Sequence, residues 1–72
     1  MKKEKRAYNR IKVVLAEKGK TNEWLASKLG NYYTTVSRWC TNEAQPTIQT
    51  FAKIAELLDV DISELFNRTK EK

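Results

Sequence analysis

The residues best suited to chemical recognition lie on one face of a short segment near the middle of the chain. That face is polar, aromatic and basic and has no acid; it carries Tyr33, Thr34, Ser37, Arg38 and Thr41. A guanidinium can pair with two acceptors at once on the edge of a guanine. Val36, Trp39 and Cys40 recur at i, i+3 and i+4, which predicts a helix whose other face packs inwards. The segment is therefore a candidate for contacting an acceptor-rich ligand.

Residues that catalysis or a metal site would need are scarce. The 72-residue chain has no histidine and a single cysteine, Cys40, which excludes an internal disulfide and a cysteine-based zinc site. The carboxylates at Asp61 and Glu64 fit helix capping, and no nucleophile lies near them. No glycine-rich phosphate loop is present. We expect no enzymatic activity, no cofactor and no metal.

The net charge of +5 is distributed unevenly along the chain. Residues 1–38 carry ten basic and three acidic side chains, whereas residues 39–66 carry one basic and five acidic side chains. A polyanion would meet the basic half. The alternative is a basic N-terminal tag on a nearly neutral domain, since residues 1–6 alone supply +3. With no long apolar run and no signal-peptide pattern, we expect a cytoplasmic protein that does not enter a membrane.

Hydrophobic periodicity predicts an all-α domain at residues 8–66, between a basic N-terminal arm (1–7) and a charged tail (67–72). The predicted helices cover 8–18, 22–29, 33–40, 48–58 and 62–66. Thr21, Thr47 and Asp61 are predicted N-caps. The predicted core residues of the fourth helix are Ile48, Phe51, Ile54 and Leu58, and Trp39 is predicted to pack beneath the third and fourth helices. For Trp24 we favour packing.

The second and third predicted helices fit a helix-turn-helix. Ala26 lies where the two helices would cross, and a larger side chain would push them apart. Gly30 can adopt the positive φ of a tight turn. Val36 would pack back onto the second helix.

Five motifs extend this pattern. They are Glu17-Lys18-Gly19, Leu25-Ala26-Ser27-Lys28-Leu29-Gly30, Thr35-Val36-Ser37-Arg38-Trp39, Gln45-Pro46-Thr47 and Ala55-Glu56-Leu57-Leu58-Asp59-Val60-Asp61. Together they resemble the phage-repressor/Cro-like (XRE-type) helix-turn-helix family, without a gap from Ile11 to Phe66. The resemblance implies a compact five-helix, repressor-like domain that binds duplex DNA with helix 33–40 in the major groove, usually as a dimer on a palindrome.

The resemblance also implies roles for individual residues. The expected base readers are Tyr33, Thr34, Ser37 and Arg38. The expected phosphate contacts are Thr21, Asn22, Thr35, Thr41, Asn42 and Gln45. The basic charge of residues 1–38 adds Lys20 as a further expected phosphate contact. Ile62, Leu65 and Phe66 are expected to form an isologous homodimer interface, because so short a chain cannot bury them all.

Several positions depart from the family pattern. Asn22 replaces a longer glutamine, and Tyr32 replaces the usual serine or threonine cap, so that Asn31 is an alternative cap. For Tyr32 and Tyr33, DNA contact and core packing are equally favoured. The family pairs an arginine with a glutamate at the positions held here by Leu15 and Cys40. We predict that Leu15 and Cys40 touch and that Cys40 is a shielded packing residue, since packed apolar groups can replace a buried ion pair.

The sequence thus favours a sequence-specific duplex-DNA-binding regulator, a small repressor. The alternative is an antitoxin-like or adaptor module whose main role is to bind a partner protein. Selection of bound DNA from a random pool would discriminate between the two.

Overall fold

The structure, a computed structural model, describes residues 7–67. Within that range it contains four α-helices and one 3₁₀ turn: α1 (Ile11–Glu17), α2 (Asn22–Leu29), α3 (Tyr33–Cys40), α4 (Ile48–Leu58) and η1 (Ile62–Leu65). The all-α class is confirmed. The predicted fifth helix is wrong, because η1 is a single 3₁₀ turn after which Phe66 is extended. Most of the basic arm (1–6) and of the charged tail (68–72) lies outside the described residues.

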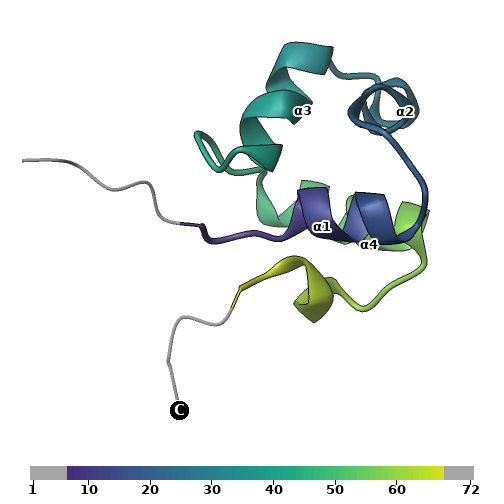
Figure 1. Ribbon diagram of the computed structural model, residues 1–72, viewed down its shortest axis with the longest axis vertical. Coiled ribbons are helices and arrows are strands. Elements are labelled where there is room, and N and C mark those ends of the chain that lie inside the picture. Colours follow the sequence, from purple (N-terminus) through teal and green to yellow (C-terminus); the bar gives the residue numbers. More distant parts are fainter. Residues whose placement is uncertain (1–6, 68–72) are drawn as a thin grey trace, which may run out of the picture.

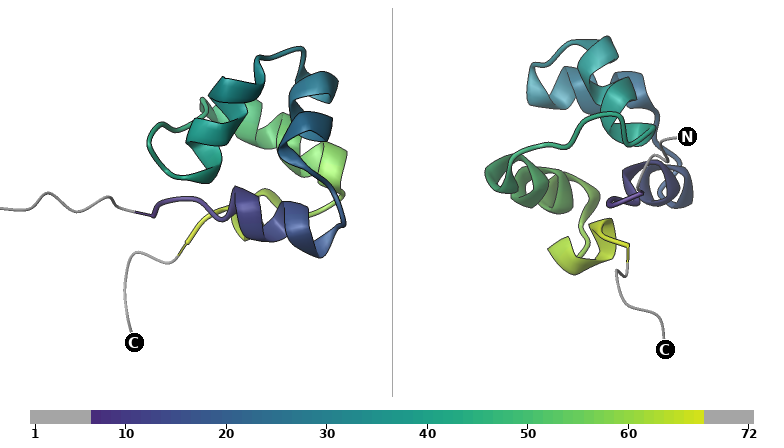
Figure 2. Two further views of the ribbon diagram at one scale, coloured as in Figure 1. Left: turned by 45° about the horizontal axis from the view of Figure 1, so that its top comes forward. Right: turned by 90° about the vertical axis from the view of Figure 1, so that its left-hand side faces the viewer.

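The helices form two groups in space (Figures 1 and 2). The helix-turn-helix pair, α2 and α3, makes one end of the molecule. α1 and α4 lie beneath it, and η1 lies at the opposite end. None of the helices between residues 7 and 67 is long and apolar enough to cross a membrane.

One hydrophobic core joins all five elements. Its buried members are Ile11, Val14, Leu15, Leu25, Ala26, Val36, Trp39, Cys40, Phe51, Ile54, Ala55, Leu58 and Leu65. The predicted inward face of α3, made of Val36, Trp39 and Cys40, is confirmed. Ile48 was predicted to be core but is 67% exposed. It is the first residue of α4, and because side chains lean towards a helix's N-terminus, it points past the packed region.

The segment before α1 is extended, whereas the sequence predicted a helix from residue 8. The Asn9 side chain accepts from the Ile11 N–H at 3.0 Å and so starts the helix at Ile11. The Arg10 N–H donates to the Leu65 carbonyl at 2.8 Å, and the Asn67 N–H donates to the Tyr8 carbonyl at 2.9 Å. Residues 8–10 therefore pair with residues 65–67 instead of extending α1.

The turn between α2 and α3 depends on a backbone conformation. Gly30 has φ of 69° and ends α2 in the left-handed region. The Asn31 N–H then donates to the Ala26 carbonyl at 2.9 Å, which satisfies a carbonyl that the helix end would leave unpaired. A Cβ on Gly30 would meet no heavy atom within 4 Å. Glycine is favoured here by φ and not by lack of space.

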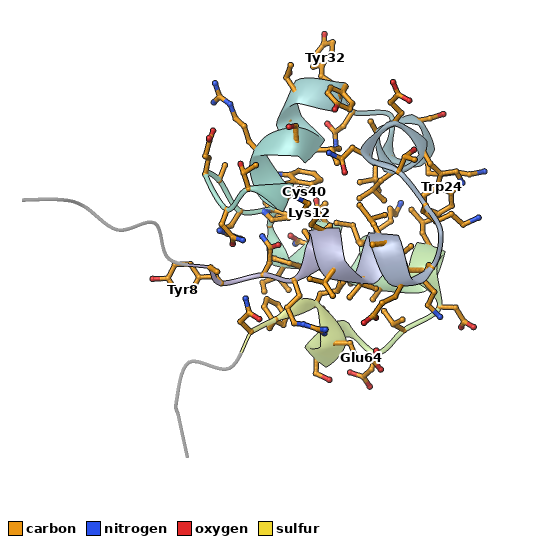
Figure 3. The ribbon with its side chains drawn as sticks, viewed as in Figure 1. Tyr8, Lys12, Trp24, Tyr32, Cys40 and Glu64 are labelled. Atoms are coloured by element: carbon orange, nitrogen blue, oxygen red, sulfur yellow. The ribbon has the colours of Figure 1, made fainter. Side chains whose placement is uncertain are left out.

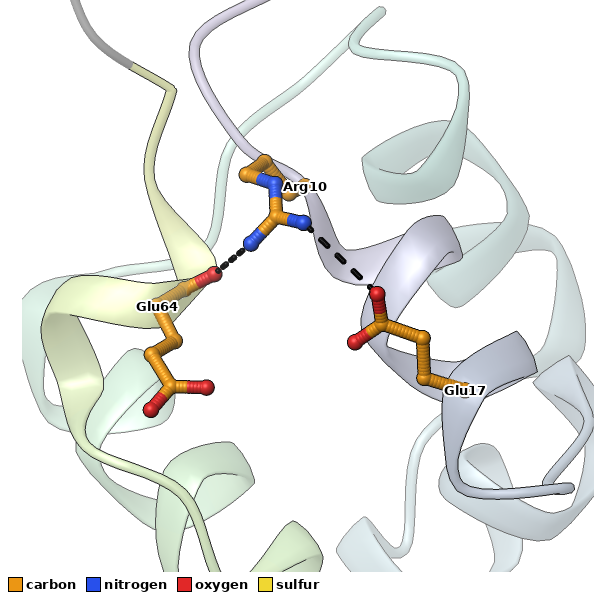
Figure 4. A network of polar contacts seen from close by, with 3 residues as sticks. All are labelled: Arg10, Glu17 and Glu64. Atoms are coloured by element: carbon orange, nitrogen blue, oxygen red, sulfur yellow. Dashed lines mark hydrogen bonds and ion pairs between the residues drawn. The ribbon is translucent and has the colours of Figure 1, made fainter.

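Arg10 links the start of α1 to η1 (Figure 4). Its guanidinium donates to the Glu64 carbonyl at 2.8 Å and lies 3.9 Å from the Glu17 carboxylate. The first contact ties two elements together. The second is long and largely solvated, so it adds little stability.

Candidate nucleic-acid interface

The outward face of α3 is polar, basic and free of acid. Thr34 and Arg38 are exposed and Ser37 is half-buried, while Val36, Trp39 and Cys40 fill the inward face. This separation follows from helical spacing, because residues three and four apart share one side. The four predicted base readers, Tyr33, Thr34, Ser37 and Arg38, are thus brought onto one helix.

Two exposed tyrosines mark the start of α3. Tyr32 is 80% exposed and Tyr33 51% exposed, so neither ring is a core residue. Figure 3 shows Tyr32 projecting from the end of the molecule formed by α2 and α3. The N-cap position of α3 is held by Tyr32 and not by Asn31, and no side chain makes a capping hydrogen bond there. The helix therefore begins with backbone N–H groups that no cap satisfies.

The start of α2 lies beside the end of α3. The Thr21 hydroxyl accepts from the Trp24 N–H at 3.0 Å, which caps α2 as predicted. Asn22 is half-buried, and its Oδ1 accepts from the Cys40 thiol at 3.2 Å. Burial raises the pKa of the Cys40 thiol, while the nearby Lys12 ammonium lowers it less. The thiol is therefore a protonated donor at neutral pH.

Cys40 is shielded, as the departure from the family pattern predicted, and is 8% exposed. Leu15 is buried in the same core cluster. The direct contact between the two stays a prediction. The sequence did not predict that the polar partner of Cys40 is Asn22.

The loop after α3 is held by a residue that sequence reasoning missed. Asn9 is 3% exposed and is the one buried polar residue among residues 7–67. Its Nδ2 donates to the Trp39 carbonyl at 3.0 Å and to Gln45 Oε1 at 2.7 Å. Gln45 Nε2 donates to Asn42 Oδ1 at 3.0 Å. Two predicted phosphate contacts, Asn42 and Gln45, are therefore part of an internal network.

Thr35 and Thr41, the other two predicted phosphate contacts on and after α3, differ in the exposure of their side chains. Thr35 is half-buried, and Thr41 is exposed. The Thr41 hydroxyl donates to the Arg38 carbonyl at 3.2 Å. Its oxygen still has lone pairs, but its single hydrogen is used within the helix end.

Lys20 and Lys28 flank the ring of Trp24. Their ammonium nitrogens lie 4.9 Å and 6.0 Å from the ring centroid. Trp24 is partly buried against the core, and Figure 3 places it on the outer side of α2. The ring both packs, as favoured from the sequence, and holds two cations at the surface.

The three residues expected at a dimer interface have different environments. Leu65 is fully buried within the chain, so its side chain serves the core and is not available to a partner. Ile62 is half-buried. Phe66 is 36% exposed, and its ring lies 4.6 Å from that of Phe51, centroid to centroid. The interface expectation is thereby reduced to Ile62 and Phe66.

Comparison with known proteins agrees with this geometry. The sequence pattern of the Cro/C1-type helix-turn-helix DNA-binding domain matches residues 10–71. The chain belongs to this Cro/C1-type family. The Cro/C1-type domain is also similar to a solved structure, a Bacteroides fragilis protein to which DNA binding has been attributed. The two are 55% identical with a TM-score of 0.83, over 83% of this chain and 97% of that one. No curated protein matches the chain.

Membership explains why this Cro/C1-type domain has its polar groups on α3 and at the start of α2. The family is defined by DNA binding and not by catalysis. In helix-turn-helix proteins the second helix of the pair enters the major groove while the first crosses the backbone.

Proposed function

We propose that this Cro/C1-type domain is a sequence-specific transcriptional regulator that reads duplex DNA with α3 in the major groove. The observation that supports it best is the acid-free outward face of α3, with Arg38 exposed and two tyrosines uncovered at its start. Arg38 is the candidate guanine reader, through the O6 and N7 acceptors. Tyr33, Thr34 and Ser37 supply hydroxyl groups to neighbouring base edges.

Phosphate contacts would fix the position of α3 in the groove. Lys20, Thr21 and Asn22 lie together at the start of α2, where the helix dipole favours negative charge. Thr35 and Thr41 flank the reading face. Asn42 and Gln45 each keep one side-chain N–H beyond those used in the network. Contacts of this kind position the protein and carry no sequence information.

Repression by a homodimer is the most economical outcome of such binding. A domain that occupies a promoter excludes polymerase without a further activity. Two copies related by a twofold axis would present recognition helices about 34 Å apart, which matches successive major grooves on one side of B-DNA. Ile62 and Phe66 are the candidate contacts between the copies.

Selection of duplexes from a random pool, at about physiological salt, tests the function directly. We expect enrichment of a palindromic consensus with half-sites about one helical turn apart. Failure to enrich any duplex would contradict the proposal and favour the alternative, a module that binds a partner protein.

Sedimentation of Phe66→Glu tests the dimer. A charge at this position should yield a folded monomer with weak half-site binding. Val13→Glu is a matched control, because Val13 is also an exposed apolar residue but lies on α1. Circular dichroism must show both variants folded, since Phe66 also packs on Phe51. A Phe66→Glu protein that still sediments as a dimer would place the interface elsewhere.

A further inference from the structure

Cys40 and Asn22 are joined across the helix-turn-helix. Asn22 is the first residue of α2, and Cys40 is the last residue of α3. The Cys40 Sγ lies 3.2 Å from the Asn22 Oδ1, within the range for a thiol donor. Figure 3 places Cys40 on the inner side of α3, close to α1. The contact is thus made from the protected side of the motif.

This contact decides which end of the Asn22 amide faces outwards. A protonated thiol has one hydrogen to donate, so it pairs with the amide oxygen and leaves the NH₂ group on the other side. Within residues 7–67 that NH₂ group makes no hydrogen bond, and no buried side-chain nitrogen or oxygen there lacks a partner. The Asn22 Nδ2 therefore reaches solvent with both of its hydrogens free.

The position of this NH₂ group suits an anion. It stands on the first turn of α2, next to the Thr21 cap. The Thr21 oxygen accepts from the Trp24 N–H, which leaves its own hydroxyl hydrogen available. The positive end of the α2 dipole favours a phosphate oxygen at this place.

We propose that Cys40 is a positioning residue: its thiol holds the Asn22 amide with Nδ2 outwards, ready to donate to a phosphate of the DNA backbone. The inference rests on the proposed function, because it explains how the side chain that makes one of the proposed phosphate contacts is oriented. Without the thiol, the amide can rotate or flip, and the cost of ordering it is then met on binding. Cys40 acts through Asn22 and does not touch the DNA.

A double-mutant cycle on DNA affinity tests the device. The variants are Cys40→Ala, Asn22→Ala and the double variant, measured on the selected duplex and on an unrelated duplex. We expect Cys40→Ala to weaken binding about three- to tenfold on both duplexes, which is the effect of one hydrogen bond. In the Asn22→Ala background the same substitution should change affinity less than twofold.

Two controls separate positioning from general damage. Cys40→Ser keeps a donor and should recover most of the affinity lost in Cys40→Ala. Ile54→Val removes a buried methylene from α4, far from Asn22 in sequence, and should leave affinity unchanged. The salt slope should also stay unchanged in the Cys40 and Asn22 variants, because neither removes a charge.

The outcomes distinguish the two proposals. If the native chain binds no duplex, both the proposed function and the positioning role are wrong. If it binds but the effects of Cys40→Ala and Asn22→Ala are independent, or Cys40→Ser is as weak as Cys40→Ala, only the positioning role is wrong.

Discussion

The side-chain amide of Asn42 pairs with both backbone groups of Asn9. Its Oδ1 accepts from the Asn9 N–H at 3.0 Å, and its Nδ2 donates to the Asn9 carbonyl at 3.2 Å. A neighbouring β-strand would satisfy these two groups in the same way. Asn42 has φ of 63°, a left-handed conformation that asparagine tolerates better than most residues. The loop after α3 is therefore fastened to the segment before α1.

Asn9→Ala should destabilise the fold by about 2–3 kcal/mol, because it leaves the buried Ile11 N–H without its acceptor and removes the Asn9 donor to the Trp39 carbonyl and to Gln45 Oε1. Urea unfolding would measure the change. Asn67→Ala is the control, since the Asn67 side chain donates to the exposed Ala7 carbonyl and, at 3.3 Å, to the part-buried Asn9 carbonyl, and its loss leaves no fully buried group unpaired, so it should cost less. An unchanged urea midpoint for Asn9→Ala would contradict the structural role of this network.

DNA affinity should fall steeply with salt. Each phosphate neutralised on B-DNA contributes about 0.9 to the slope of log K against log salt. Lys20→Ala should reduce the steepness of that slope by the contribution of one phosphate contact, and it should weaken binding to all duplexes equally. Lys53→Ala removes the same charge from an exposed position on α4 and should leave the slope unchanged. A flat response to salt in the native chain is incompatible with phosphate-driven binding.

Arg38→Ala should cost about 1–3 kcal/mol on the selected duplex and relax preference at one base pair in each half-site. Arg38→Lys keeps the charge but loses the planar pair of donors, so it should retain non-specific affinity and lose discrimination. Competition binding with single-base variants of the duplex measures both effects. Equal losses on specific and unrelated DNA would make Arg38 a phosphate contact instead.

Tyr32→Ser should stabilise the fold by about 1 kcal/mol and weaken DNA binding. Serine can cap α3, which now begins without a side-chain cap, and the exposed ring gives up little packing. Tyr32→Ala removes the ring without adding a cap, so only its DNA affinity should fall. Thermal unfolding of both variants measures the change in stability, and DNA titration measures the change in affinity. If Tyr32→Ser binds DNA as well as the native chain, Tyr32 has no part in the interface.

The native fold should lose stability above about pH 8.5, the ordinary pKa of a thiol, in a way that Cys40→Ala abolishes. Burial raises the pKa of Cys40 in the fold. As pH rises, the unfolded thiol ionises first, so the unfolded chain binds fewer protons and stability falls until the folded thiol ionises too. The slope can reach about 1.4 kcal/mol per pH unit. Urea unfolding at pH 7–10 gives the difference between the two proteins. Parallel curves would show that the folded thiol ionises normally.

Local patterns could predict the elements that local interactions determine. The bounds of α2 and α4 follow from caps and periodicity, and the Thr21 and Thr47 caps form as predicted. Those of α3 follow from periodicity alone, because its first turn has no side-chain cap. The start of α1 could not be predicted. Asn9 reads as an ordinary helix residue until its partners at Trp39, Asn42 and Gln45 are known, and those are set by the tertiary fold.

The sequence could predict which residues belong to the site better than it could predict their hydrogen-bond partners and burial. Helical spacing alone places Tyr33, Thr34, Ser37 and Arg38 on one outward face. Spacing cannot show that the Asn42 and Gln45 side chains are hydrogen-bonded within the network around Asn9. Nor can it show that Leu65 is fully buried while Phe66 is partly exposed. These outcomes depend on which distant segment packs over each side chain.

The pairing of residues 8–10 with residues 65–67 also has a topological consequence. The Asn67 side chain donates to the Ala7 carbonyl at 2.7 Å, across 60 positions of the chain. The two ends of the folded unit are therefore adjacent, and a short peptide linker could join them without distortion. New ends could then be opened at Gly19, in the exposed turn between α1 and α2. The domain thus meets the geometric requirement for circular permutation, which usually succeeds at exposed turns in proteins with adjacent ends.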